Sequence, residues 1–153
     1  MAKFVYRMQN ILDIKLKIEN QAKIAYGMAN AKLAEEQDKL RQIMLRRAGY
    51  ERQSRDLVNG TLCIQDIREC RRAIDVMKSL QRTQMMHVHS AEKEVERARA
   101  YLNEVMMERK THEKLREKAF DQFKQELLHE EGKEIDELVS YSYHDDTDSA
   151  GET

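Results

Sequence analysis

A heptad repeat of apolar side chains runs through most of this chain, and no proline interrupts it. Proline removes a backbone donor and clashes with the preceding helical turn, so a chain without proline can form very long helices. Only five glycines occur in 153 residues, whereas β-rich folds need turn residues about every ten positions. The sequence therefore predicts an all-α fold built from long helices.

Two apolar seams, each advancing in alternating steps of three and four residues, define two helices. The first seam runs from Val5 to Leu57 and is apolar at eleven of sixteen positions, and the second runs from Cys63 to Val105 and is apolar at eleven of thirteen. This spacing is the period of a coiled coil, and the second seam is the more regular of the two. The pattern then weakens at Arg109, His112 and Arg116, returns at Ala119, Phe120 and Phe123, and predicts a helix end near Leu128.

The segment Val58-Asn59-Gly60-Thr61 separates the two seams. Asn-Gly readily adopts the left-handed conformation that ends a helix, and Thr61 is a suitable cap for the next helix. A link this short makes its two helices antiparallel neighbours. We therefore expect residues 1–129 to form a long antiparallel two-helix coiled-coil hairpin with its turn near 58–61 and without the enclosed cleft of a conventional enzyme.

The net charge of −1 conceals a strong asymmetry along the chain. Residues 130–153 contain nine acidic residues and one basic residue, so they carry −8 and residues 1–129 carry +7. Residues 130–153 also lack apolar periodicity after residue 140, which predicts an acidic and largely disordered C-terminal tail.

Several classes of site are excluded by the absence of their motifs. No apolar stretch is long enough to span a membrane, and no signal peptide is evident, so we expect a cytoplasmic protein. Cys63 and Cys70 lie too far apart on one helix for a disulfide and are expected to be small apolar core residues. The His-Glu pairs lack the second histidine of a zinc site, and no phosphate-binding loop or nucleophile elbow occurs. We predict no catalytic residue, no metal and no cofactor.

The candidate binding site is a cluster of arginines around the predicted turn. Residues 41–82 contain ten basic residues, nine of them arginine, against five acidic residues. Arginine is preferred for planar contacts with carboxylates, which favours docking onto an acidic protein surface, while a solvated helical face remains the alternative. Tyrosine and arginine are common anchors of protein interfaces. The candidate protein-binding residues are Arg46, Arg47, Tyr50, Leu57, Arg71 and Arg72.

Four segments, in order, resemble the FliJ family of flagellar export proteins. They span residues 4 to 137, nearly the whole chain, and their spacing fits a family of this length. One departure is visible, because Cys63 and Asp66 replace what looks like a Ser-x-x-Glu capping box. The segments are Phe4-x-Tyr6-x-Met8-x-x-Ile11-Leu12-Asp13-x-Lys15, Gly60-x-x-x-x-Gln65-Asp66-Ile67-Arg68, Glu108-Arg109-Lys110-x-x-Glu113-Lys114-Leu115-Arg116-Glu117-Lys118-x-Phe120-x-x-Phe123 and Glu130-Glu131-x-Lys133-Glu134-x-Asp136-Glu137.

The resemblance implies a non-enzymatic component of the flagellar type III export apparatus, with a role in flagellum biogenesis, motility and chemotaxis. Members of the family resemble the central stalk of rotary ATP synthases. They associate with the export ATPase ring, contact the export gate at the cytoplasmic membrane and engage export chaperones. The resemblance thus implies a cytoplasmic protein whose contact with the membrane is peripheral and made through its partners.

Two alternatives remain open. A nucleic-acid-associated coiled coil would use the arginines on phosphates, although interleaved acids, few aromatics and the acidic tail weigh against it. A generic self-associating coiled coil would form a parallel dimer of unbroken helices.

Overall fold

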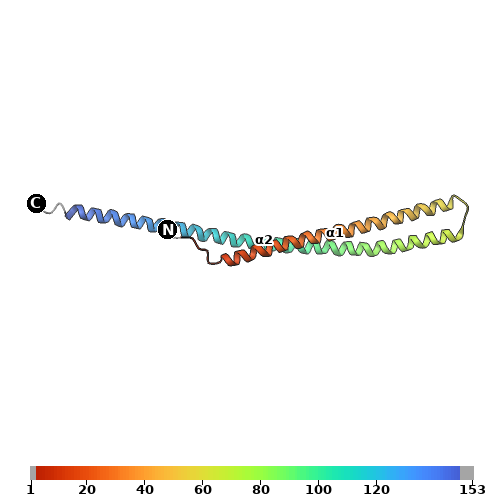
Figure 1. Ribbon diagram of the computed structural model, residues 1–153, viewed down its shortest axis with the longest axis horizontal. Coiled ribbons are helices and arrows are strands. Elements are labelled where there is room, and N and C mark those ends of the chain that lie inside the picture. The colour runs from red at the N-terminus through yellow and green to blue at the C-terminus, as the bar shows by residue number, and fades with distance from the viewer. Residues whose placement is uncertain (1–2, 149–153) are drawn as a thin grey trace. The chain divides into compact units, whose positions relative to one another are not determined.

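Two long helices account for nearly all of the chain that the structure describes. The computed structural model describes residues 3–148, with α1 spanning Gln9–Val58 and α2 spanning Ile64–Asp148 (Figure 1). Residues 59–63 connect them, and no strand occurs among the described residues. No helix there is long and apolar enough to cross a membrane. The predicted all-α, two-helix fold is confirmed.

The chain divides into two units, in each of which a segment of α1 packs against a segment of α2. The turn unit is Lys17–Met106, and the terminal unit combines the described residues of Met1–Leu16 and Met107–Thr153. In the turn unit, the Cys70 thiol lies 3.2 Å from the Tyr50 carbonyl, and the Gln84 amide lies 2.9 Å from the Glu36 carbonyl. The residue of α2 in these contacts has a higher number where the residue of α1 has a lower one, so the two helices pack antiparallel.

Burial follows the predicted seams closely. In the turn unit, every predicted seam position of α1 from Glu19 to Leu57 is buried or half-buried, and so is every seam position of α2 from Ile67 to Val105. A 3-4 repeat keeps one stripe of each helix facing its partner, so even polar residues in that stripe are covered. Three predicted seam residues at the ends, Val5, Met8 and Cys63, are instead exposed.

The connection between the helices is built differently from the prediction. No residue in the described chain has a positive φ, so Asn59-Gly60 does not use the left-handed conformation. Instead the Asn59 amide donates to the Asp56 carbonyl at 3.2 Å, which closes α1 with a tight turn. The Cys63 carbonyl accepts the Ile67 amide at 3.1 Å. Cys63, rather than Thr61, is therefore the N-cap residue of α2.

The predicted helix end near Leu128 is wrong, because α2 continues to Asp148. Gly132 has no positive φ, and a single glycine costs a helix only about 1 kcal/mol relative to alanine, which does not terminate it. From Leu128 to Tyr143 every side chain is exposed. The disorder of residues 130–153 and the division at residue 129 stay predictions, and residues 149–153 lie outside the described residues.

Candidate protein-interaction site

The Arg-rich segment, residues 41–82, exposes nearly all of its basic side chains. Arg46, Arg71 and Arg72 are exposed, and none of the three forms an ion pair or hydrogen bond with another described residue. Arg41, by contrast, lies 3.6 Å from Asp38 of the preceding turn. An exposed and unpaired guanidinium keeps all five donors available, so these three side chains have the chemistry required to bind carboxylates.

Arg47 occupies a different environment from the other candidate arginines. It is half-buried on the α1 seam, where its Nε donates to Glu51 Oε1 at 3.0 Å and its Nη1 donates to Gln81 Oε1 of α2 at 2.9 Å. The contact with Gln81 links the two helices, and together the two contacts use two of the five guanidinium donors. Arg47 therefore serves the packing of the turn unit.

Tyr50 and Leu57 are brought together in the turn unit. Both are half-buried and line a shallow groove of about 410 Å³, and none of the candidate arginines lines it. The groove is bordered by two carboxylates of α2 as well as by seam residues. The remaining lining residues are Gln53, Asp66, Glu69, Cys70 and Ala73.

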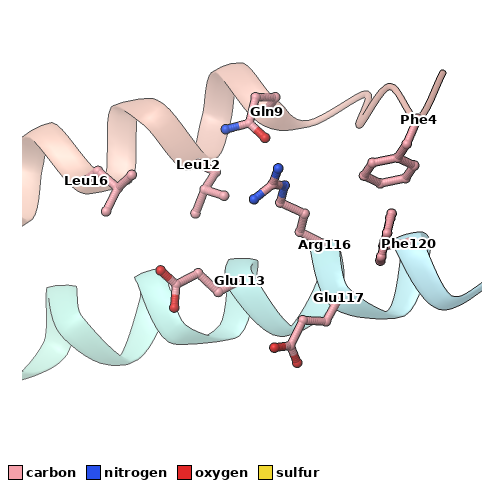
Figure 2. A pocket seen from close by; sticks show the side chains of 8 residues that line it. All are labelled: Phe4, Gln9, Leu12, Leu16, Glu113, Arg116, Glu117 and Phe120. Atoms are coloured by element: carbon pink, nitrogen blue, oxygen red, sulfur yellow. The ribbon is translucent and has the colours of Figure 1, made fainter.

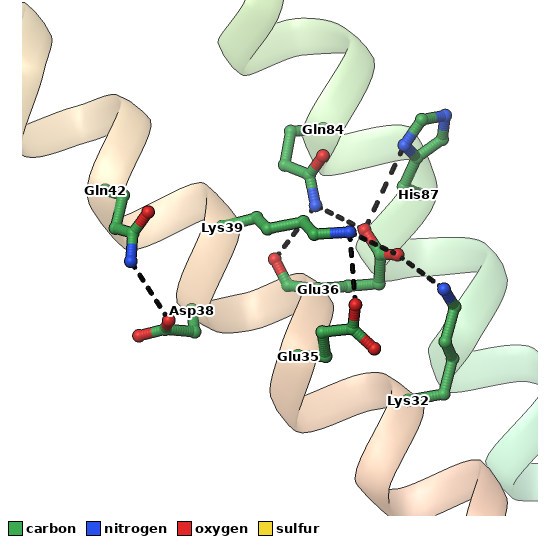
Figure 3. A network of polar contacts seen from close by, with 8 residues as sticks. All are labelled: Lys32, Glu35, Glu36, Asp38, Lys39, Gln42, Gln84 and His87. Carbon is green, nitrogen blue, oxygen red and sulfur yellow. Dashed lines mark hydrogen bonds and ion pairs between the residues drawn. The ribbon is translucent and has the colours of Figure 1, made fainter.

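A buried polar cluster lies in the middle of the turn unit, and no sequence motif singled it out (Figure 3). Glu36 is only 6% exposed and Gln84 only 8%. The Gln84 side-chain amide donates both to the carboxylate and to the backbone carbonyl of Glu36. Both residues occupy polar seam positions of opposite helices, so the heptads predict that each faces the partner helix but do not specify that the two pair with each other.

Two lysines of α1 form ion pairs with the Glu36 carboxylate in this cluster. Lys32 Nζ lies 3.1 Å and Lys39 Nζ 3.8 Å from Glu36 Oε1. The hydrogen bonds from Gln84 and Lys32 hold the pKa of Glu36 below its ordinary value, and the contact with Glu36 raises the pKa of Lys32. The carboxylate is thus kept ionised inside the seam.

The terminal unit carries an aromatic cluster beside a groove (Figure 2). The Phe4 ring, which precedes α1, packs edge-on against Phe120 with 5.1 Å between ring centroids, and against Phe123 at 5.5 Å. The groove beside them has a volume of about 480 Å³, and all three charged residues that line it lie on α2. Its lining residues are Phe4, Gln9, Leu12, Leu16, Glu113, Arg116, Glu117 and Phe120.

An ion pair joins the two helices in this unit. Lys15 Nζ lies 2.7 Å from Glu108 Oε2, and this contact lowers the pKa of the Glu108 carboxyl. Lys15 is a charged residue on the predicted seam, and the ion pair with Glu108 of the opposite helix balances its charge there. Its long aliphatic stem can cover the seam while the ammonium reaches solvent.

Residues typical of metal and redox chemistry are not grouped. Within residues 3–148, no set of three or more His, Cys, Asp or Glu side chains is arranged to hold a metal ion. Cys70 is buried and Cys63 is exposed, and both are free thiols. The expectation that Cys63 belongs to the core is wrong, because it precedes the first turn of α2 and has no facing helix.

A family model described as flagellar FliJ protein matches residues 4–147 of the chain. That range includes both helices except for the last residue of α2. Neither the search of curated proteins nor the search of solved structures finds a match to the chain.

Proposed function

Because the chain belongs to the FliJ family of flagellar export-related proteins, we propose that it is a non-enzymatic coiled-coil component acting with the flagellar export ATPase. The observation that carries the proposal is the match over residues 4–147. The family's resemblance to a rotary stalk assigns the chain a mechanical role, in which it packs against the ATPase ring and promotes its assembly or turnover.

The Arg-rich segment is the proposed contact with an acidic protein surface. Arg46, Arg71 and Arg72 supply the charge, because their guanidinium groups are exposed and unpaired in the described chain. Tyr50 and Leu57 supply apolar contact area beside them. Arg47 is a positioning residue that holds α1 against α2 through Gln81.

Further proposed partners are the export gate membrane protein and the export chaperones. Both are implied by the family rather than by a particular contact. The proposed location is the cytoplasm, with peripheral association at the cytoplasmic side of the cell membrane through these partners. Nucleic acid is not among the proposed ligands.

The turnover of the cognate export ATPase tests the proposed contact. Purified full-length chain should raise turnover in a saturable manner. The variant R46E/R71E/R72E should raise it at least about tenfold less at equal concentration, because three charges at the contact change sign. The matched control R99E/K110E/K114E reverses three exposed basic residues outside the Arg-rich segment and should behave as the unaltered chain.

Two results would contradict the proposal. One is ATPase turnover that stays flat across a wide ratio of the two proteins. The other is binding of random duplex DNA that the same three arginines govern and that weakens steeply with salt, which would favour the nucleic-acid alternative.

A further inference from the structure

The C-terminal part of α2 has no helix packed against it. We call residues 128–143 the C-terminal extension, and every side chain in it is exposed. In Figure 1 this part of α2 continues past the N-terminal segment of the terminal unit without a neighbouring helix. Most of the stability of a helix in a protein comes from packing of its apolar face, so a partner surface would stabilise this part of α2.

The extension carries an apolar stripe. Leu128, Ile135, Leu138 and Val139 are 67%, 60%, 71% and 58% exposed. Ile135 lies seven residues after Leu128, and Leu138 and Val139 lie three and four residues after Ile135. These spacings place all four on one face of a helix. Large apolar side chains that gather on one exposed face identify a contact surface rather than the scattered apolar exposure of an ordinary protein surface.

Unpaired negative charge accompanies this stripe. Five carboxylates and one lysine lie in the extension, and none of them forms an ion pair with another described residue. Two copies of the extension would repel each other if they paired along the stripe. The surface therefore fits a partner that is both basic and apolar. The carboxylates are Glu130, Glu131, Glu134, Asp136 and Glu137.

The Arg-rich segment of the same sequence has these complementary properties. Its exposed arginines are interspersed with exposed apolar side chains, among which Met44 and Leu45 lie on α1, and Val76 and Leu80 lie one turn apart on α2. Arg46, Arg71 and Arg72 have no described carboxylate partner. The positive charge of this segment is thus complementary to the negative charge of the extension, and both surfaces expose apolar side chains.

We propose that the C-terminal extension of one chain packs against the Arg-rich segment of a second copy. Helix α2 carries the extension and also Arg71 and Arg72 of the Arg-rich segment, whereas Arg46 lies on α1. A two-fold arrangement forms the contact twice, with each extension on the other chain's Arg-rich segment, and closes as a dimer. This inference does not depend on the proposed flagellar role.

Sedimentation equilibrium of the full-length chain at low ionic strength tests the proposal. We expect a species with twice the 18.1 kDa mass of the chain, which dissociates as salt screens the charges. Two variants each reverse the charge of one surface. The tip-reversed variant R46E/R71E/R72E alters the Arg-rich segment, and the tail-reversed variant E131K/E134K/E137K alters the C-terminal extension. Each should raise the dissociation constant at least about tenfold. Far-ultraviolet circular dichroism checks that both variants retain their helix.

The decisive sample is an equimolar mixture of the two reversed variants. In the heterodimer, one contact joins two unaltered surfaces and the other joins two reversed surfaces, so both contacts pair opposite charges. The heterodimer should therefore form although neither variant self-associates. For the apolar stripe, Leu138→Ser should weaken association, while Leu115→Ser, at a 45% exposed position outside the extension, should leave it unchanged.

Three results would overturn the proposal. The unaltered chain could remain monomeric at every concentration and salt. Both reversed variants could dimerise as well as the unaltered chain, which would assign the contact to another face. A chain that carries both reversals could regain compactness while the mixture of single variants stays monomeric, which would assign the contact to a single chain. The variant E131K/E134K/E137K leaves the three arginines unchanged, so loss of its dimer with unchanged stimulation of the ATPase separates this inference from the proposed function.

Discussion

At the scale of single residues, the depth of burial depends on position in the heptad more than on the type of side chain. Met77 is 5% exposed on the α2 seam, whereas Met86, nine residues later and off the seam, is 71% exposed. Glu19 is 3% exposed although it is charged. A two-helix core is one seam wide, so residues beside the seam face water whatever their hydrophobicity.

This contrast predicts different effects for two chemically identical substitutions. Met77→Ala should lower the free energy of unfolding by about 2–5 kcal/mol, because it removes buried apolar surface and leaves a cavity. Met86→Ala should change it by less than about 0.5 kcal/mol. Urea denaturation followed by circular dichroism measures both. Equal losses for the two variants would contradict the assignment of the seam.

The heptads predicted which residues face the partner helix, but they did not predict what polar residues do there. Arg47, a candidate binding residue, bonds to Gln81 of the opposite helix, which the heptads did not predict. Cys63 was expected in the core and is instead the exposed N-cap residue of α2, whose carbonyl accepts the Ile67 amide. The contact of Arg47 depends on how the two helices align with each other, and the exposure of Cys63 depends on where α2 begins. The spacing within one helix specifies neither.

At the scale of helices, the pairing of Glu36 with Gln84 aligns α1 with α2 in the turn unit. A slip of one heptad would leave both polar groups opposite apolar side chains, and a buried polar group without its hydrogen bond is destabilising. Polar residues at single seam positions are a known means of specifying register in coiled coils, at some expense of stability. The lysines beside Glu36 favour the same alignment by keeping its carboxylate charged.

The lowered pKa of Glu36 predicts an acid-dependent loss of stability. Its folded pKa lies below the ordinary value of 4.5, so its contribution is complete above that pH and is lost as pH falls through the folded pKa. Thermal unfolding between neutral and acidic pH measures the effect. Glu36→Gln should flatten the dependence in this window, and the control Glu35→Gln, whose side chain is 57% exposed, should not. A Glu36→Gln profile that parallels the unaltered chain would contradict the role of this carboxylate.

The ends of the helices were less predictable than their interiors. The absence of proline and the seam phase predicted both helices, while the termination of α1 without a positive φ and the continuation of α2 to Asp148 were not foreseen. The residue at which a helix ends depends on single hydrogen bonds and on propensity differences of roughly 1 kcal/mol. Such small differences do not allow the end to be predicted from composition.

At the scale of the whole chain, two levels of information combine. The regular seams and the charge asymmetry follow from the sequence alone, and the family match over residues 4–147 relates them to flagellar export. No rule of helix packing could have supplied that function, because the same fold serves unrelated roles and function resides in particular surfaces. The surfaces that we propose as interaction sites are the Arg-rich segment and the C-terminal extension.

Export of flagellar protein by cells that lack this gene tests the central claim most directly. We predict that such cells form no filaments, that the intact chain restores secretion of filament protein to the medium, and that R46E/R71E/R72E restores at most about a tenth of it. R99E/K110E/K114E, expressed at the same level, should restore it fully. Normal filament growth in the deletion, or full rescue by the tip-reversed variant, would contradict the account.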